Sequence, residues 1–132
     1  MRCALRRLGL PVLAAALLAA GCGDDPEGPG ALDLRASASV PLGAAVIELE
    51  GEGLQGVEQP ASGWVELVPV APRNGVPVHR LVVIREQAGV LAVRLQVTDV
   101  ESVRPTATVI EAADAADQIL PSPTAVQVSI QR

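Results

Sequence analysis

The sequence predicts an all-β sandwich, and three observations lead to that prediction. Apolar and polar residues alternate with a period of two in most segments after residue 30, as they do in strands that bury one face. Glycine, proline and Asn-Gly turn signals separate these segments at short intervals. The apolar residues are mainly Val, Leu, Ile and Ala, and the 132-residue chain has one tryptophan and no phenylalanine or tyrosine. We therefore expect a core of β-branched and small side chains.

Three strands are expected in the first half of the domain. They cover residues 32–40, 45–50 and 64–70. In the first of them Leu, Ala and Val at even positions alternate with Asp, Arg and Ser at odd positions, and Pro41 and Gly43 end the segment. Between the second and third strands, a glycine-rich stretch from Gly51 to Gly56 predicts a loop in which Leu54 and Val57 insert into the core.

Four further strands are expected at residues 78–85, 91–98, 106–111 and 126–131. Residues 71–75 predict a turn, since they end in Asn-Gly. The run 81–84 is apolar on both faces, which indicates a central strand, and the strands on either side of Gly89 are expected to form a hairpin. The alanine-rich segment 112–120 predicts one or two helical turns that Pro121 terminates.

Seven short strands in about 100 residues, with one short helical turn before the last strand, fit an immunoglobulin-like β-sandwich. In strand count and pattern the domain is similar to the cohesin-like and related sandwich modules of bacterial surface proteins. That similarity has no sequence motif behind it, so it assigns no binding residue.

The first 22 residues have the pattern of a secretory signal. Arg2, Arg6 and Arg7 precede an apolar stretch from Leu8 to Ala20, which is too short for a membrane-spanning helix of about 20 residues. Small residues then lead directly to Cys22. This ending resembles the lipobox of bacterial lipoproteins, with alanine where leucine is usual at the third position before the cysteine. The resemblance implies a diacylglycerol on the Cys22 thiol, cleavage after residue 21 and acylation of the new amino terminus.

The expected organisation is a removed signal over residues 1–21, a lipidated tether over 22–30 and a β-sandwich domain over 31–132. A retained transmembrane helix, or an ordinary signal with an incidental cysteine, are the alternatives. The lipoprotein interpretation predicts a cell-envelope location outside the cytoplasm. Gly23 follows the cysteine where an inner-membrane retention signal would have aspartate, which favours the outer membrane in an organism that has one.

Composition narrows the range of partners. After residue 21 the chain keeps seven arginines, no lysine and all fifteen of its carboxylates, for a formal charge of −8. Such a domain has no basic patch for phosphate backbones, so nucleic acid is excluded as a partner class. It would also be repelled by an anionic lipid surface, so the lipid on Cys22 is expected to hold it at the membrane. With Cys3 in the signal and Cys22 lipidated, no disulfide is expected.

The candidate chemical residues are few. His79 is the only histidine, without a second histidine or a free cysteine for a zinc or copper site and without a nucleophile motif. We therefore expect a structural or surface role for His79, no catalytic residues and no cofactor. Trp64, the only aromatic residue, is expected in the core, as a lone tryptophan in a small sandwich commonly is; a partner-binding or sugar-stacking surface position is the alternative.

Acidic residues form the other candidate group. Glu48, Glu50 and Glu52 lead into the glycine-rich stretch, and further acidic pairs are Asp99 with Glu101 and Asp114 with Asp117. Pooled carboxylates could bind calcium, which takes six to eight oxygen ligands, but EF-hand spacing is absent and a solvated acidic face is the simpler interpretation.

The sequence thus favours a lipid-anchored binding or structural module that meets an envelope protein or wall component through a loop end or a strand edge. Trp64, Glu50 and Glu52 are the candidate binding surface. A calcium- or glycan-binding domain is the alternative, and a small hydrolase is the third hypothesis.

Overall fold

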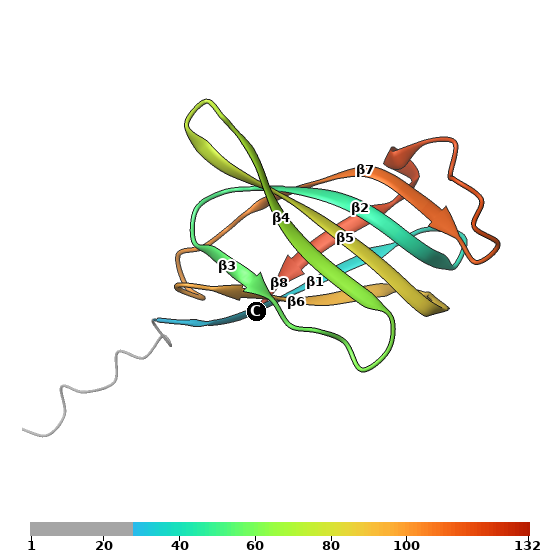
Figure 1. Ribbon diagram of the computed structural model, residues 1–132, viewed down its shortest axis with the longest axis horizontal. Helices are drawn as coiled ribbons and strands as arrows, with labels where there is room; N and C mark the ends of the chain where they lie inside the picture. Colours follow the sequence, from blue (N-terminus) through green and yellow to red (C-terminus); the bar gives the residue numbers. More distant parts are fainter. Residues whose placement is uncertain (1–27) are drawn as a thin grey trace, which may run out of the picture.

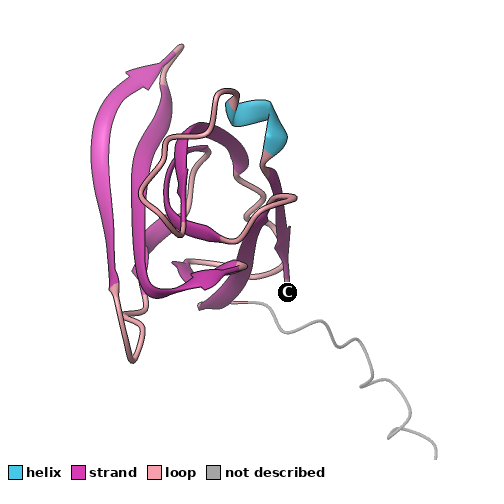
Figure 2. Cartoon of the chain, turned by 90° about the vertical axis from the view of Figure 1, so that its right-hand side faces the viewer, coloured by secondary structure: helices cyan, strands magenta, loops and turns pink. Residues whose placement is uncertain are grey.

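The protein is an all-β sandwich, as expected. The computed structural model describes residues 28–132, which form two four-stranded antiparallel sheets packed against each other (Figures 1 and 2). The elements are β1 (Gly30–Ser37), β2 (Leu42–Glu50), β3 (Leu54–Val57), β4 (Trp64–Arg73), β5 (Val76–Gly89), β6 (Leu91–Val97), β7 (Thr106–Asp114), the 3₁₀ turn η1 (Pro123–Ala125) and β8 (Gln127–Gln131). The expected signal and Cys22 lie outside the described residues. Within residues 28–132, no helix is long and apolar enough to cross a bilayer.

The strand order places sequence neighbours in different sheets. Sheet A has the order β3-β6-β1-β8, and sheet B has the order β4-β5-β2-β7. Of these pairings only β4 with β5 joins strands that follow each other along the chain. Their connection is the tight turn at Asn74 and Gly75, whose φ angles of 52° and 79° fit the Asn-Gly preference of a type I′ turn. Figure 1 shows this hairpin extending beyond the rest of the sandwich.

The core lies between the sheets and follows the period-two alternation. In β6, for example, Leu91, Val93, Leu95 and Val97 are buried, whereas the residues between them are exposed. The same alternation in β1 buries Leu32, Leu34 and Ala36 opposite them. Sheet B contributes fully buried side chains from three strands: Ala45, Ile47 and Leu49 in β2, Val65 in β4, and Leu81 and Val83 in β5.

The hairpin expected around Gly89 is wrong. β5 already has β4 and β2 on its two sides, and β6 pairs with β1 and β3 in the other sheet. β5 therefore continues through the residues expected to turn, and the chain changes sheet at the exposed Val90. The physical reason is the pairing of two alternating strands: buried residues of β6 lie directly beside buried residues of β1 in the same sheet, as in the pairs Leu95 with Leu32 and Val93 with Leu34.

The helix expected over residues 112–120 is also wrong in position. β7 continues to Asp114, since Ala112 and Ala113 pair with β2, and this pairing overrides the helix propensity of alanine. The Asp114 carboxylate then accepts hydrogen bonds from the backbone N–H groups of Ala116 (2.8 Å) and Gln118 (3.0 Å) and closes a turn. The short helical turn before the last strand is η1, which starts at a proline.

The remaining differences concern strand limits. Leu54–Val57, expected as a loop, is the edge strand β3, although Leu54 and Val57 do pack against the core as expected. β1 ends at Ser37 rather than at residue 40, and β4 continues through residues 71–73, which were expected to turn. The sandwich therefore has eight strands rather than about seven.

Candidate functional site

The outward-facing surfaces of the two sheets differ in character. Sheet A presents polar side chains to solvent, among them Asp33 and Arg35 of β1, Arg94 and Gln96 of β6, and Ser129 of β8. The outward-facing positions of sheet B include several large apolar side chains instead. Residues 28–132 contain seven large hydrophobic residues with high exposure, and four of them lie on the outer face of sheet B: Trp64 (46%), Ile84 (46%), Ile110 (44%) and Val68 (38%). The outer face of sheet B is therefore the candidate site.

Strand register brings these side chains together. Trp64 of β4 is paired with Ile84 of β5, and in the next outward row Val82 of β5 is paired with Val46 of β2. A bulge in β7 places both Ile110 and Glu111 opposite Val46, between the inward-facing Val109 and Ala112. We call the following residues the apolar patch: Val46, Trp64, Val68, Val82, Ile84 and Ile110.

A shallow hollow lies in the floor of the apolar patch. One row of paired residues runs across sheet B from Trp64 through Ile84 and Ala44 to Ala113. The first two side chains of this row are large and the last two are single methyl groups, so the surface is lower over the two alanines. The resulting hollow has a volume of about 210 Å³, and its walls include Val46, Val82, Ile84 and Glu111. It is large enough to receive one apolar side chain of a partner.

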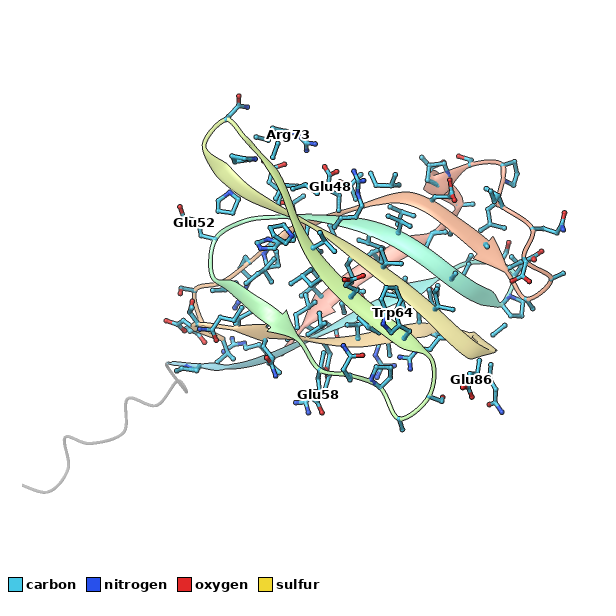
Figure 3. The ribbon with its side chains drawn as sticks, in the orientation of Figure 1. Glu48, Glu52, Glu58, Trp64, Arg73 and Glu86 are labelled. Atoms are coloured by element: carbon cyan, nitrogen blue, oxygen red, sulfur yellow. The ribbon has the colours of Figure 1, made fainter. Side chains whose placement is uncertain are left out.

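The other half of the same face is charged and internally neutralised. Arg73 donates to Glu48 (2.5 Å) and to Glu50 (3.0 Å), and Arg80 lies 3.7 Å from the second Glu48 oxygen. The pKa of the Arg73 guanidinium is raised above its usual value, chiefly by the hydrogen bond to Glu48 and next by the negative charge of Glu48. We call Glu48, Glu50, Arg73 and Arg80 the ion-pair cluster. Figure 3 shows Trp64 near one end of β4 and Arg73 near the other, beside Glu48.

The half of the face that carries the ion-pair cluster contains outward-facing residues with very low exposure. Glu48 is only 9% exposed although it faces outward, which fits a carboxylate held between two guanidinium groups. Val78 is 2% exposed but does not belong to the core cluster, and it lies beside Glu50 and Val70 on the outer face. Its side chain is thus out of contact with solvent although it lies on the outer face. This half of the face is thus closed, whereas the apolar patch is open.

The expected core position of Trp64 is wrong. Val65, which is 1% exposed, is the inward-facing residue of this part of β4, and the alternation turns Trp64 outward. The three candidate surface residues do not converge. Trp64 and Glu50 are separated by six residues along the strands, or about 20 Å. Glu52 lies outside both halves of the face, in the β2–β3 connection beside Thr98 and Arg104.

The other chemical candidates are dispersed. His79 faces inward, paired with Leu49 and Pro69, and its buried Nδ1 has no hydrogen-bond partner among the described residues. Asp99 accepts hydrogen bonds from the backbone N–H groups of Glu101 (2.8 Å) and Ser102 (3.4 Å), and the bond from Glu101 is the largest cause of its lowered pKa. In residues 28–132 no three His, Cys, Asp or Glu side chains gather as a metal site would require.

The sheet edges offer little room for strand addition. On β4 the Gln59 side-chain amide donates to the Val65 carbonyl (2.8 Å), and Pro69 and Pro72 have no N–H to offer. β3 has four residues and β8 has five. The edge of β7 is interrupted by its bulge and is partly paired through the bridge between Ala113 and Ile119. A face is thus better suited to binding than a strand edge.

No family model matches the chain, and no curated protein or solved structure is significantly similar to it. The site is therefore interpreted from its own residues. The signal in the sequence that could have found it is the apolar character of β4 and β5 in both phases of the alternation.

Proposed function

We propose that this protein is a lipid-anchored binding module of the cell envelope, which is held at the membrane through Cys22 and contacts an envelope partner through the apolar patch. The observation that carries the proposal is the uncovered apolar face of sheet B. The main apolar patch on the surface of a soluble domain is often a functional surface, even when its area is no more than a few hundred Å². The polar outer face of sheet A supports the same interpretation, since it shows that this sandwich does not expose apolar side chains on both sides.

The sequence supports the anchor. Basic residues, a short apolar stretch and small residues before Cys22 are the features of a lipoprotein signal, and the segment from residue 23 to the start of β1 at Gly30 is short. A domain on such a tether stays near the membrane surface, where a partner in the same membrane or the adjoining wall is at high effective concentration. A weak face-to-face contact can then be sufficient.

The calcium hypothesis has no specific support. The Glu48 and Glu50 carboxylates are engaged by arginines, and Glu52 lies in a loop with a different environment. The glycan hypothesis rests on Trp64 alone, without a second aromatic face. We therefore propose a protein partner or an apolar wall component in preference to either.

Two experiments in the native cell test this proposal. Cys22→Ser is expected to move the protein out of the membrane fraction or to stall its processing; an unchanged membrane fraction with no loss of labelled fatty acid would exclude the anchor. A photo-crosslinking amino acid in place of Ile84 is expected to give one reproducible adduct. The same group in place of Arg35, on the outer face of sheet A, is the matched control and should give none. Equal labelling at both positions would contradict a site on sheet B.

A further inference from the structure

We propose that the partner presents a basic amphipathic segment to the apolar patch, with one apolar side chain in the hollow and a cationic side chain on each side of it. This inference rests on the proposed function and adds the chemistry of the partner. It comes from two carboxylates that flank the patch and from the size and charge of the patch as a whole.

Glu66 and Glu111 stand at opposite margins of the apolar patch. The register places them in one row across sheet B, with Glu66 on β4 and Glu111 on β7 and with Val82 and Val46 between them. Both side chains are exposed, and neither takes part in an ion pair within residues 28–132. Glu111 also lines the hollow. The patch is therefore apolar in the middle and negative at both margins.

Neither of the two arginines on this face is paired with these two carboxylates in the structure. Arg73 is bonded to Glu48 and Glu50, and Arg80 also lies against Glu48. The charge on Glu66 and Glu111 is thus available to a partner. A partner that carries cations at matching places gains two ion pairs, and the same arrangement repels an acidic partner.

The spacing suits an extended segment. β4 and β7 are separated by three strand-to-strand steps of about 4.8 Å, so Glu66 and Glu111 lie roughly 14 Å apart across the sheet. In an extended chain with a rise of about 3.3 Å per residue, every second side chain points the same way, and side chains four residues apart are separated by about 13 Å. Cationic residues at the first and fifth positions would therefore reach the two carboxylates, and the third residue would enter the hollow.

A second copy of this chain does not fit the face. Residues 28–132 carry twelve carboxylates and seven arginines, for a formal charge of −5, and face-to-face pairing would bring four unpaired carboxylates together. From Trp64 to Val68 and from β4 to β7 the patch measures roughly 14 Å by 14 Å, or about 200 Å². A standard protein interface buries about 800 Å² on each partner. The patch thus fits a short segment better than a stable dimer.

The chain contains its own probe for a test. Trp64 is the only tryptophan and there is no tyrosine, so the intrinsic fluorescence of the protein reports on the apolar patch alone. We would titrate the mature lipidated chain, in protein-free phosphatidylcholine vesicles, with a nine-residue non-aromatic peptide that has arginine at its third and seventh positions and leucine at its fifth. Two control peptides replace both arginines by glutamate, or the leucine by serine. We expect saturable protection of Trp64 from iodide quenching and a blue shift with the first peptide only.

Variants of the protein make the test specific. Glu66→Gln combined with Glu111→Gln is expected to weaken binding of the arginine peptide by about tenfold, since each exposed ion pair contributes a small amount. Glu52→Gln combined with Asp117→Asn removes the same charge at exposed positions off the patch and should leave the Kd unchanged. Raising the salt concentration from about 50 to about 300 mM should also lower the affinity of the protein that has both carboxylates, because salt ions screen the two ion pairs. The affinity of the double variant should change much less.

The outcomes separate this inference from the proposed function. Equal binding of the arginine and glutamate peptides, or an unchanged Kd in the Glu66 and Glu111 variant, would overturn the basic-segment proposal. If the Ile84 crosslink still forms in cells, the binding face would stand and only its partner chemistry would be wrong. A crosslinked product of twice the chain's mass would identify a second copy as the occupant and would likewise overturn this proposal.

Discussion

The free energy of unfolding should respond very differently to one truncation made on the two sides of sheet B. Ile47 of β2 and Ile84 of β5 are in adjacent inner strands, but Ile47 is fully buried in the core and Ile84 is 46% exposed on the outer face. The change of isoleucine to alanine is chemically identical at both positions, and its effect on strand propensity is similar. The difference between the two variants therefore isolates the burial of each side chain.

The structure sets the expected magnitudes. Truncation of a fully buried isoleucine costs about 2–5 kcal/mol, because transfer energy is lost and a cavity remains. Full burial of such a side chain is worth about 1.5–3 kcal/mol, and Ile84 has roughly half of this burial and no closed cavity to leave behind. Ile84→Ala should thus cost about 1 kcal/mol, and Ile47→Ala should cost at least about 1 kcal/mol more.

Urea unfolding followed by far-ultraviolet circular dichroism measures both changes, with unaltered m-values as evidence that the transition remains two-state. Fluorescence is unsuitable here, because Ile84 is paired with the tryptophan that would report. Equal losses of stability in the two variants would refute the reasoning. Such a result would mean that the outer face of sheet B is packed as tightly as the core, and it could not then be free for a partner.

Two further predictions concern the scaffold. Gly63 has a φ of 82°, and a Cβ at this position would lie 2.3 Å from the Ile84 carbonyl oxygen. Gly75 has a φ of 79°, but no atom lies within 4 Å of a Cβ there, so Gly75→Ala carries only the backbone cost of about 1–2 kcal/mol. Gly63→Ala should therefore lower the melting temperature more than Gly75→Ala. The pKa of Asp99 is lowered from its ordinary value of 3.8 by the bond from the Glu101 N–H, so its contribution to stability is present above that value and is lost as the pH falls through the lower folded-state pKa. Melting temperatures between about pH 5 and pH 2 should accordingly fall less steeply in Asp99→Asn than in the parent, and parallel curves would contradict this role for Asp99.

The fold class could be predicted because alternation was clear where one face of a strand is polar. β1 and β6 show this best: Asp33 and Arg35 lie between buried residues in β1, and Arg94 and Gln96 lie between buried residues in β6. Pairing partners could not be predicted in the same way. The alternation of β5 and β6 is compatible with a hairpin. The hairpin does not form because β4 and β2 pair with the two edges of β5, and β1 and β3 pair with the two edges of β6.

The candidate site was harder to predict for a related reason. β4 is apolar in both phases, with Trp64, Val68 and Val70 in one and Val65 and Leu67 in the other, so sequence alone did not tell which set faces the core. The same holds for residues 81–84, whose apolar character correctly indicated an inner strand but not that its second face is open. All eight strands of residues 28–132 belong to the two sheets, so none of the described residues forms a further layer over that face.

The strand order also dictates when the domain can fold. Apart from the β4–β5 hairpin, every pairing joins strands that are distant along the chain, and β1 lies between β6 and β8. Such non-local topologies fold slowly, on the scale of milliseconds to seconds, because long loops must close before any contact is gained. The hairpin that carries Trp64 can form early, whereas β1 must wait for β8, which is the last of the eight described strands along the chain. Until then its apolar side chains have no complete sheet to join, and the interval is a period of vulnerability to aggregation.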